Sequence, residues 1–514
     1  MPNRTFVSEV GGATFTYTEF GDYTRRWAAS FARIGVQRGE LVAVMMPTCA
    51  DGLAAWLGLS ALGAVCVPFN TAYKGETLRY QLDNCAATRA VVAAQWLDTV
   101  ANAAVDGRLD VVIVPDRDAI PHRGREFKVL TPSEFLVRDA GEQYIAEPQA
   151  WDTAAVVYTS GTTGNAKGVM IPWGQIRNMV VGADPFPLDE SLVYYDPYPL
   201  FHLAGMTPAY SSAVGGGKVV LRNGFSTTAF WDDVTAHGCT RVTMFAATAH
   251  FLLQQTPSTH DTDNTLRHVL MVPTIPNVDE FIQRFGVQVS TLYGSTELGS
   301  PLFSPTDVTL EPGLCGQQRR GYQLRLVDSH DVEVPDGAVG ELVIRPDEPW
   351  TMMTGYLRMP EATSEVNRNL WFHTGDAMRR DPNGLLYFVD RVKDSIRRRG
   401  ENISSVVVEA EVQCHPDVGE VACVAAASPY GEDDVRIIVV PGSSRTIDPA
   451  ELIEFLEDRM PRFMLPRYVD IVDRLPRTLT DRVRKDELRR RPIDDSVWDR
   501  ERATVQPPAG RRPT

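Results

Sequence analysis

Continuous apolar runs that alternate with helical segments constrain the fold of this chain most. Apolar residues recur at helical spacing from Phe20 to Ile34 and stop at Gly35, which predicts a helix. A second helix is predicted over Ala50–Leu62. Runs of strand length that are apolar almost throughout are Leu41–Met46, Ala64–Phe69, Val111–Pro115, Val193–Pro197, Val219–Leu221, Val242–Phe245, Val269–Val272 and Val289–Tyr293. Strands without a polar face need cover on both sides, so we predict an α/β fold with a largely parallel sheet.

Two other patterns follow the α/β part. From Gly321 to Arg345, short alternating strands separated by turn signals predict a small β-rich subdomain. Beyond residue 393, the predicted elements follow the order αββαβ: Val407–His415, Val421–Ala426, Val435–Pro441, Pro449–Met460 and Tyr468–Val472. We therefore expect a large N-terminal domain over 1–392 and a small α+β domain over 393–490. Residues 491–514 are rich in Pro, Arg and Asp without periodicity, which predicts a disordered tail.

Composition limits the number of domains, the kinds of partner and the cellular location that we expect. The chain has 514 residues, 43% of them apolar, which is enough for a large core and at least two domains. A net charge of −15 argues against nucleic acid or an anionic membrane surface as the main partner. The seven cysteines are widely spaced and form no CxxC pair. This usage is typical of reduced thiols in the cytoplasm and offers no zinc site.

One uncharged stretch, Gly52–Tyr73, is long enough to cross a bilayer. Gly58 and Gly63 interrupt it and Pro68 lies near its end, so we interpret it as a buried helix followed by a buried strand rather than as a membrane span. The N-terminus lacks the basic-then-apolar pattern of a signal peptide. We expect a cytoplasmic protein.

The segment Tyr158–Val169, YTSGTTGNAKGV, gathers residues that suit a polyphosphate. Gly161 and Gly164 let backbone N–H groups approach phosphate oxygens without interference from a Cβ atom. Hydroxyl donors and one cation come from Thr159, Ser160, Thr162, Thr163 and Lys167. A P-loop has Gly directly before the Lys and Ser or Thr directly after it, whereas Lys167 lies between Ala and Gly. We therefore predict a nucleotide loop of another kind.

Four polar clusters follow this loop: Tyr293–Glu297 (YGSTE), Trp371–Asp376 (WFHTGD), Asp390–Asp394 (DRVKD) and Arg399–Ser404 (RGENIS). The first lies at the carboxyl end of a predicted strand, where open α/β sheets bind ligands. The second ends in a carboxylate that is able to accept two ribose hydroxyls. Each cluster alone is a weak signal, but the loop and the clusters in this order indicate a nucleotide-dependent enzyme.

With these motifs, the chain resembles the adenylate-forming superfamily of acyl- and aryl-CoA synthetases, luciferases and peptide-synthetase adenylation domains. The resemblance covers roughly residues 10–490. Phe281–Glu297 and the GENIS run look most like the CoA ligases that act on carnitine-type and other short acids. The resemblance implies a mobile C-terminal domain and a two-step reaction. A carboxylate attacks the α-phosphate of Mg-ATP, and a thiol, usually that of CoA, then attacks the acyl-adenylate.

The resemblance also implies roles for single residues. The loop of Thr159, Ser160, Gly161, Thr162, Thr163, Gly164 and Lys167 would hold the β- and γ-phosphates. Thr296 would contact the α-phosphate, and Glu297, with Thr163, would ligate Mg²⁺. Tyr293 and Gly294 would flank the adenine. Asp376 would bind the ribose, with Arg391 nearby, and Lys393 would be the hinge. His202 would line the acyl and pyrophosphate side of the pocket, with a buried structural histidine as an equal alternative.

The chain departs from the family pattern at two places. Met271–Pro276 (MVPTIP) replaces a Gly-Gly-Ala-Pro-like segment, so bulkier side chains alter the expected pocket floor. Arg482 stands where the family has its catalytic Lys, and Asp481 replaces the usual Gly. Arg and Lys differ in shape at a tight site. Either Arg482 retains the function, which we favour, or Lys485 supplies the ammonium, or adenylation is slow or serves an unusual oxyacid.

We therefore expect an ATP-dependent acid–CoA ligase that binds ATP, Mg²⁺ and CoA, without nucleic acid or a membrane span. A second class is an adenylating enzyme of secondary metabolism, which activates nitrite to diazotise an aryl amine or loads an acid onto a carrier-protein thiol. A third is a non-catalytic ATP- or AMP-binding relative. The presence of Lys167, Glu297 and Asp376 argues against the third.

Overall fold

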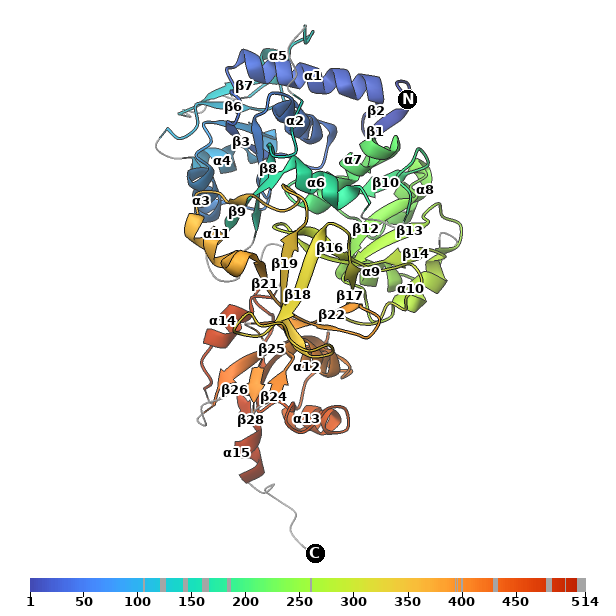
Figure 1. Ribbon diagram of the computed structural model, residues 1–514, viewed down its shortest axis with the longest axis vertical. Helices are drawn as coiled ribbons and strands as arrows, with labels where there is room; N and C mark the ends of the chain where they lie inside the picture. The colour runs from blue at the N-terminus through green and yellow to red at the C-terminus, as the bar shows by residue number, and fades with distance from the viewer. Residues whose placement is uncertain are drawn as a thin grey trace, which may run out of the picture.

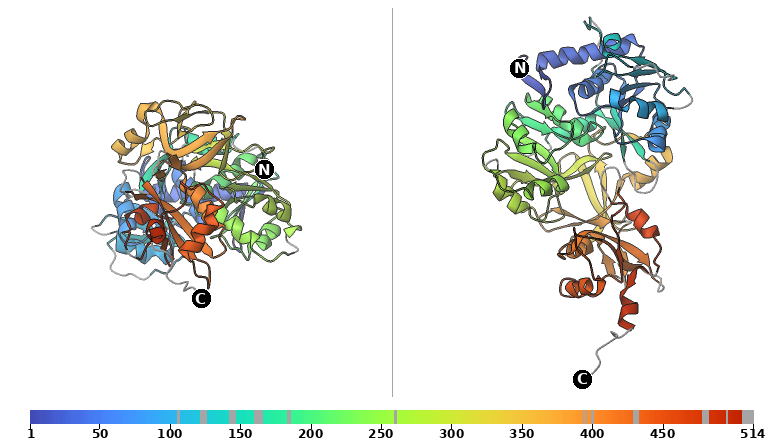
Figure 2. Two further views of the ribbon diagram at one scale, coloured as in Figure 1. Left: turned by 90° about the horizontal axis from the view of Figure 1, so that it is seen from below. Right: turned by 180° about the vertical axis from the view of Figure 1, so that it is seen from behind.

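A larger N-terminal part and a smaller C-terminal unit lie end to end in the molecule (Figure 1), and the view from behind gives the same division (Figure 2). The structure is a computed structural model. It describes residues 1–104, 107–120, 126–141, 147–159, 166–182, 186–258, 261–392, 394, 396–398, 401–428, 433–477, 483–494 and 496–505.

Two sheets of the N-terminal part are mainly parallel, as predicted. The first runs in the order β14 (Gln288–Ser290), β13 (His268–Val272), β12 (Arg241–Phe245), β10 (Val193–Asp196), β11 (Lys218–Leu221), β1 (Thr5–Glu9) and β2 (Thr14–Thr16). The second runs in the order β20 (Gly355–Tyr356), β9 (Lys167–Pro172), β8 (Thr153–Thr159), β4 (Val65–Pro68), β3 (Leu41–Met45), β5 (Arg89–Val92), β6 (Val111–Ile113) and β7 (Lys128–Leu130). Only the pairs β1–β2, β8–β9 and β9–β20 are antiparallel in these two sheets as described.

Helices lie against these sheets (Figure 1). They are α1 (Tyr17–Arg33), α2 (Ala50–Ala61), α3 (Gly75–Cys85), α4 (Leu97–Ala103), α5 (Pro132–Phe135), α6 (Trp173–Val180), α7 (Leu203–Gly215), α8 (Phe230–His237), α9 (Ala246–Leu253), α10 (Val278–Phe285) and α11 (Pro360–Val366). The first predicted helix is confirmed as α1, which begins with a capping box between Thr16 and Glu19. Its side chains Phe20, Trp27 and Phe31 are buried, so the apolar spacing does mark the core face.

The stretch Gly52–Tyr73 contains most of α2 and all of β4, both largely buried, so the interpretation as helix and strand is confirmed. Within the described ranges, no helix is long and apolar enough to cross a membrane.

A third sheet is antiparallel throughout: β15 (Leu292–Ser295), β16 (Gly299–Phe303), β17 (Leu314–Gln318), β22 (Leu386–Arg391), β21 (Phe372–Arg380), β19 (Val339–Pro346) and β18 (Tyr322–Val327). The predicted β-rich part is thus larger than Gly321–Arg345.

The single strand predicted over Val289–Tyr293 is wrong, because the chain changes sheets within it. β14 ends at Ser290, and β15 begins at Leu292 in the antiparallel sheet. Thr291 joins them: its N–H donates to Ser304 Oγ at 2.8 Å, and its carbonyl accepts from Ser304 N–H at 2.9 Å. These two hydrogen bonds to Ser304, in the loop after β16, take the place of hydrogen bonds to the parallel sheet. It carries the YGSTE segment away from the parallel strands.

The C-terminal unit contains the predicted αββαβ elements as α12 (Ser405–Gln413), β25 (Val418–Ala427), β26 (Asp433–Pro441), α13 (Pro449–Glu457) and β27 (Tyr468–Ile471). A hairpin, β23 (Ile396–Arg398) and β24 (Glu401–Ile403), precedes them. Helix α14 (Lys485–Arg490), strand β28 (Trp498–Asp499) and helix α15 (Arg500–Val505) follow.

The disordered tail expected over 491–514 is wrong for residues 496–505, whereas 506–514 lie outside the described residues. β28 pairs antiparallel with β27, and Arg467 holds it through ion pairs to Asp499 at 3.4 Å and to Asp434 at 2.8 Å. The guanidinium of Arg436, 1% exposed, pairs with Asp470 at 2.7 Å and donates to the carbonyl of Arg491 at 2.7 Å. A polar composition therefore did not prevent order, because the segment supplies partners for buried charges.

Candidate active site

The predicted phosphate loop joins the two strands of a hairpin. Thr159 ends β8 and Lys167 begins β9, and the two residues are paired across the antiparallel ladder. The hydroxyl of Thr159 donates to the carbonyl of Lys167 at 3.4 Å. The loop residues Ser160, Gly161, Thr162, Thr163 and Gly164 lie outside the described residues.

Lys167 and Glu297, which the sequence assigns to phosphate and metal, meet at Tyr356. The ammonium of Lys167 lies 4.8 Å from the centre of the Tyr356 ring, within cation–π range. The Tyr356 hydroxyl donates to Glu297 Oε1 at 3.0 Å. Burial first, and then the Glu297 carboxylate, raise the pKa of Tyr356, so the phenol stays a donor. Tyr356 reaches this place because β20 pairs with β9, with Tyr356 opposite Val169.

The turn that carries Thr296 and Glu297 is fixed from two sides. The buried amide of Gln175, on α6, donates to the carbonyl of Thr296 at 2.8 Å. The Met353 N–H donates to the carbonyl of Glu297 at 2.9 Å. Gly294 permits the tight approach of β15 and β16, because a Cβ atom there would lie 2.1 Å from the Gly299 carbonyl oxygen. Contacts from α6, Met353 and β16 therefore hold the YGSTE segment in place.

The expected ribose and adenine residues form a second cluster. The Tyr293 hydroxyl donates to Asp376 Oδ2 at 2.6 Å, and Arg391 Nε lies 2.8 Å from Asp376 Oδ1. Asp376 and Arg391 are directly opposite in the pairing of β21 with β22. Burial and then the charge of Asp376 raise the pKa of the Tyr293 phenol well above its usual value. The structure therefore brings three residues together from β15, β21 and β22.

His202 lies on another side of the phosphate hairpin. It precedes α7, where its carbonyl accepts from Gly205 N–H at 2.9 Å, and its ring packs on Phe201 at 4.7 Å. A small cavity beside it is also lined by Tyr158, Asn70 and other residues. His202 thus shares a cavity with Tyr158, the residue directly before Thr159.

Of the two basic residues expected to compete for the catalytic role, Arg482 and Lys485, the structure describes only Lys485. Arg482, like the hinge Lys393, lies outside the described residues. Lys485 has its ammonium 2.7 Å from Glu409 Oε1 and donates to Ser405 Oγ at 2.6 Å. Ser405 in turn donates its N–H to Asp390 at 2.5 Å, which links α12 to β22. In this conformation Lys485 joins α14 to α12 within the C-terminal unit, and Ser405 makes the contact with Asp390 on β22.

The donor set fits a magnesium ion at Glu297. One carboxylate oxygen accepts from Tyr356, and the other, Oε2, has no hydrogen-bond partner in the part of the chain that the structure describes. An open carboxylate oxygen in the same cluster as Lys167, which we expect to bind phosphate, is the kind of ligand that Mg²⁺ uses together with nucleotide phosphates. Thr163, the other expected ligand, lies outside the described residues.

Sequence reasoning missed Tyr356 and Gln175. Neither belongs to a polar motif: Tyr356 follows Gly355 in a two-residue strand, and Gln175 lies within a mostly apolar helix. A glutamine in the mostly apolar helix directly after the β8–β9 hairpin was a local signal for Gln175.

The fold and the site define a nucleotide-dependent enzyme with a separate C-terminal unit, and comparison with known proteins agrees. The family described as "AMP-binding enzyme" matches residues 1–357, and the "AMP-binding enzyme C-terminal domain" matches residues 407–482. The chain belongs to the AMP-binding enzyme family.

Three relatives illustrate the likeness. A crotonobetaine/carnitine–CoA ligase from Salmonella typhimurium is 28% identical over 496 residues, which is 92% of this chain and 93% of that protein. ATP-bound MatB from Rhodopseudomonas palustris has a TM-score of 0.82 and 25% identity, covering 95% of this chain and 96% of MatB. The o-succinylbenzoate CoA synthetase MenE from Bacillus subtilis, in complex with an acyl-adenylate, has a TM-score of 0.81 at 22% identity, with 95% of each chain covered. The MenE likeness concerns the fold alone.

Proposed function

We propose that this protein is an AMP-forming acid–CoA ligase. It activates a carboxylic acid with Mg-ATP and transfers the acyl group to the thiol of CoA. The observation that carries the proposal is that Tyr356 holds Lys167 over its ring and Glu297 at its hydroxyl. Tyr293, four residues before Glu297, joins the cluster with Asp376 and Arg391. The relatedness to a crotonobetaine/carnitine–CoA ligase and to ATP-bound MatB supports the same reaction class.

In the first step, a carboxylate oxygen of the acid attacks the α-phosphorus of ATP. The bond from that phosphorus to the bridging β-oxygen breaks, and pyrophosphate leaves with the electron pair. Such a transfer needs positioning and neutralisation of charge rather than covalent help from the protein. We assign neutralisation to Lys167 and to the loop Thr159–Gly164, and contact with the α-phosphate to Thr296. Glu297 would hold Mg²⁺, which screens the phosphate oxygens when bound.

In the second step, the CoA sulfur attacks the acyl carbon. The carbon–oxygen bond to AMP breaks, AMP leaves, and the thiol proton is released. We propose that the C-terminal unit, residues 393–490, turns about Lys393 between the steps, and that Arg482 serves the first step. Asp376 would hold the ribose in both steps, with Tyr293 and Gly294 beside the adenine, and His202 would border the acid. The seven free cysteines support a cytoplasmic location.

Pyrophosphate release tests the proposal. The protein is incubated with Mg-ATP and a panel of short, aryl and fatty acids, with and without CoA, and Glu297→Ala is the inactive control. Acid-dependent release together with acyl-CoA formation is the expected result. Release that requires nitrite and an aryl amine, or an acid and a carrier protein but not CoA, would overturn the assignment in favour of the second class. No release with any of these would indicate a binding protein.

A further inference from the structure

Asp376 lies in an irregular segment of β21. In the pairing of β19 with β21, Glu341 is opposite Ala377 and Val343 is opposite His373. Thr374, Gly375 and Asp376 therefore stand opposite Leu342 alone, and they form an enlarged bulge. Gly375 has a φ of +69°, in the left-handed region that favours glycine. Bulged residues lose their ladder partners, so other groups must satisfy their N–H groups.

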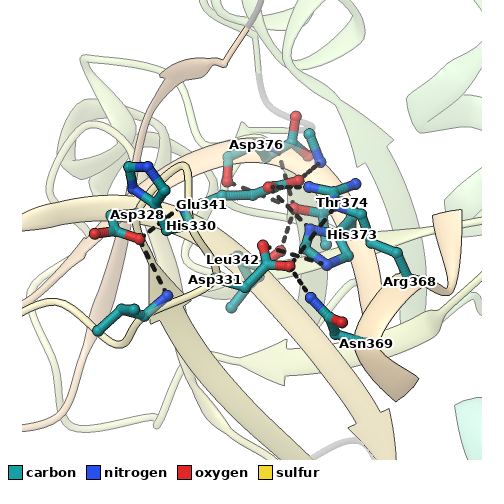
Figure 3. Close-up of polar contacts among 12 residues, drawn as sticks. Asp328, His330, Asp331, Glu341, Leu342, Arg368, Asn369, His373, Thr374 and Asp376 are labelled. Atoms are coloured by element: carbon teal, nitrogen blue, oxygen red, sulfur yellow. Dashed lines mark hydrogen bonds and ion pairs between the residues drawn. The ribbon is translucent and has the colours of Figure 1, made fainter. Parts of the chain in front are cut away.

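Two side chains satisfy this bulge. Glu341 Oε1 accepts the Gly375 N–H at 3.0 Å. The Thr374 hydroxyl accepts the Asp376 N–H at 3.0 Å and donates to the Leu342 carbonyl at 2.7 Å. The Gly375 N–H and the Thr374 hydroxyl, on the two residues before Asp376, are thus bound by Glu341 and by the strand on which it lies (Figure 3). The Gly375 carbonyl accepts from the Val392 N–H at 2.9 Å on the other side.

Glu341 is itself contacted by side-chain nitrogens of two residues, His373 and Arg368. Its Oε2 lies 3.0 Å from His373 Nδ1 and 3.1 Å from a terminal nitrogen of Arg368. The side chain of Glu341 is 14% exposed and that of His373 3% exposed. Asp331 stands on the far side of both, 3.8 Å from His373 Nε2 and 3.9 Å from Arg368 Nε, and also accepts from Asn369 (Figure 3). The carboxylate of Glu341 therefore has one orientation.

We propose that Glu341 is a positioning residue for recognition of the nucleotide ribose. It does not touch the nucleotide. Its carboxylate fixes the bulge so that Asp376 faces Tyr293 and Arg391 rather than the interior of the sheet. The inference rests on the proposed function only in that Asp376 binds ribose hydroxyls. The Gly375 N–H donates to a charged acceptor, which is one of the stronger kinds of hydrogen bond, so its loss should loosen the bulge.

Discrimination between ribose and its analogue without hydroxyls tests the proposal. In steady-state assays, the ratio of kcat/KM for ATP to that for 2′,3′-dideoxy-ATP measures the contribution of the two ribose hydroxyls to recognition of the nucleotide. Glu341→Ala should lower this ratio by roughly tenfold, while KM for the acid and for CoA stays unchanged. Glu341→Gln keeps an acceptor for the Gly375 N–H and should retain most of the ratio. Glu333→Ala, an exposed carboxylate nearby that lies 3.9 Å from Arg325, is the control and should leave it unchanged.

A loss of activity that is equal with both nucleotides would overturn the proposal, because it would indicate a structural role only. If Glu341→Ala fails to fold, the Gln variant decides. Asp376→Ala gives the ratio expected when the ribose carboxylate is missing. A ratio in Glu341→Gln as low as that of Asp376→Ala contradicts the expected retention. Calorimetric binding of AMP and 2′,3′-dideoxy-AMP repeats the comparison without acid or CoA. A wild-type protein that binds the two equally overturns the ribose assignment, whereas AMP discrimination without ligase turnover overturns only the proposed function.

Discussion

The hydroxyl of Tyr356 donates a hydrogen bond to Glu297 at 3.0 Å. Tyr356 and Glu297 belong to different sheets, β20 beside the phosphate hairpin and the turn between β15 and β16. The same ring faces the ammonium of Lys167. One tyrosine thus links the strand that carries the lysine to the turn that carries the carboxylate.

Removing the hydroxyl of Tyr356 tests this link. Tyr356→Phe keeps the ring beside Lys167 but frees Glu297, so we expect roughly a tenfold loss in kcat/KM for Mg-ATP and a higher Mg²⁺ requirement. Titration of pyrophosphate release with Mg-ATP and with Mg²⁺ measures both. Tyr210→Phe, on α7, is the matched control and should behave as wild type. Unchanged kinetics in Tyr356→Phe would show that Glu297 does not depend on this contact.

Arg482 gives a second prediction, which follows from the sequence. Arg482→Lys restores the residue type of the family, so the rate of adenylation should be kept or raised while the CoA step barely changes. Single-turnover formation of the adenylate, followed separately from thioester formation, measures the two steps. A large loss of adenylation in the Lys variant would mean that the guanidinium has its own role.

Lys485 should matter for stability rather than for chemistry. Its ion pair with Glu409 is largely buried, with 15% and 22% of the side chains exposed. Burial raises the pKa of Glu409 in spite of Lys485, so the carboxylate is costly to leave unpaired. We expect Lys485→Ala to destabilise the C-terminal unit by about 3 kcal/mol, measured by chemical denaturation.

The double variant Lys485→Ala/Glu409→Gln should recover part of that loss, because it removes the unpaired charge. Arg459→Ala removes an exposed partner of Glu411 and serves as the control. If Lys485→Ala abolished adenylation but left stability unchanged, Lys485 would be the catalytic ammonium.

His268 predicts a pH dependence of stability. Burial first, and then the charge of Arg241, lower the pKa of His268 from 6.5 to about 2. The unfolded chain therefore binds a proton below pH 6.5 that the folded chain rejects. The stability is fully present above pH 6.5 and is lost as the pH falls from there toward 2, at about 1.4 kcal/mol per pH unit from this residue.

Unfolding of His268→Gln between pH 6.5 and 5 should accordingly show a shallower loss of stability than the wild type. The exposed His330 provides the comparison, and His330→Gln should keep the wild-type slope. Equal slopes in wild type and His268→Gln would contradict the burial of a neutral imidazole.

Much of the fold was predictable because apolar runs report burial directly. α1 and α2 lie within a few residues of the predicted ranges, and so do the strands β3, β4, β6, β10, β11, β12 and β13. The change of sheet at Thr291 was not predictable, since it depends on hydrogen bonds to Ser304, which lies in the loop after β16. The ordered segment 496–505 was missed for a similar reason: Arg467, the partner of Asp499, is distant in sequence.

The candidate site was predictable where a motif carries the chemistry. Tyr293, Asp376 and Arg391 come from three separate motifs, and in the structure they are in contact. Tyr356 and Glu341 were not found, because a lone tyrosine and a lone glutamate on a strand carry no local pattern. Only the pairing of β20 with β9 and of β19 with β21 brings them to the site.

The contact of Arg436 with the carbonyl of Arg491 has a practical consequence for anyone who shortens this protein. The family match ends at residue 482, and a truncation soon after it would look harmless in an alignment. Cutting there would open the interior of the small unit to water and strip Asp470 of a second cation, Arg491, at 3.0 Å. Arg491 covers the buried pair of Arg436 and Asp470, and Asp499 of β28 pairs with Arg467, so a shortened protein should keep the residues through 505.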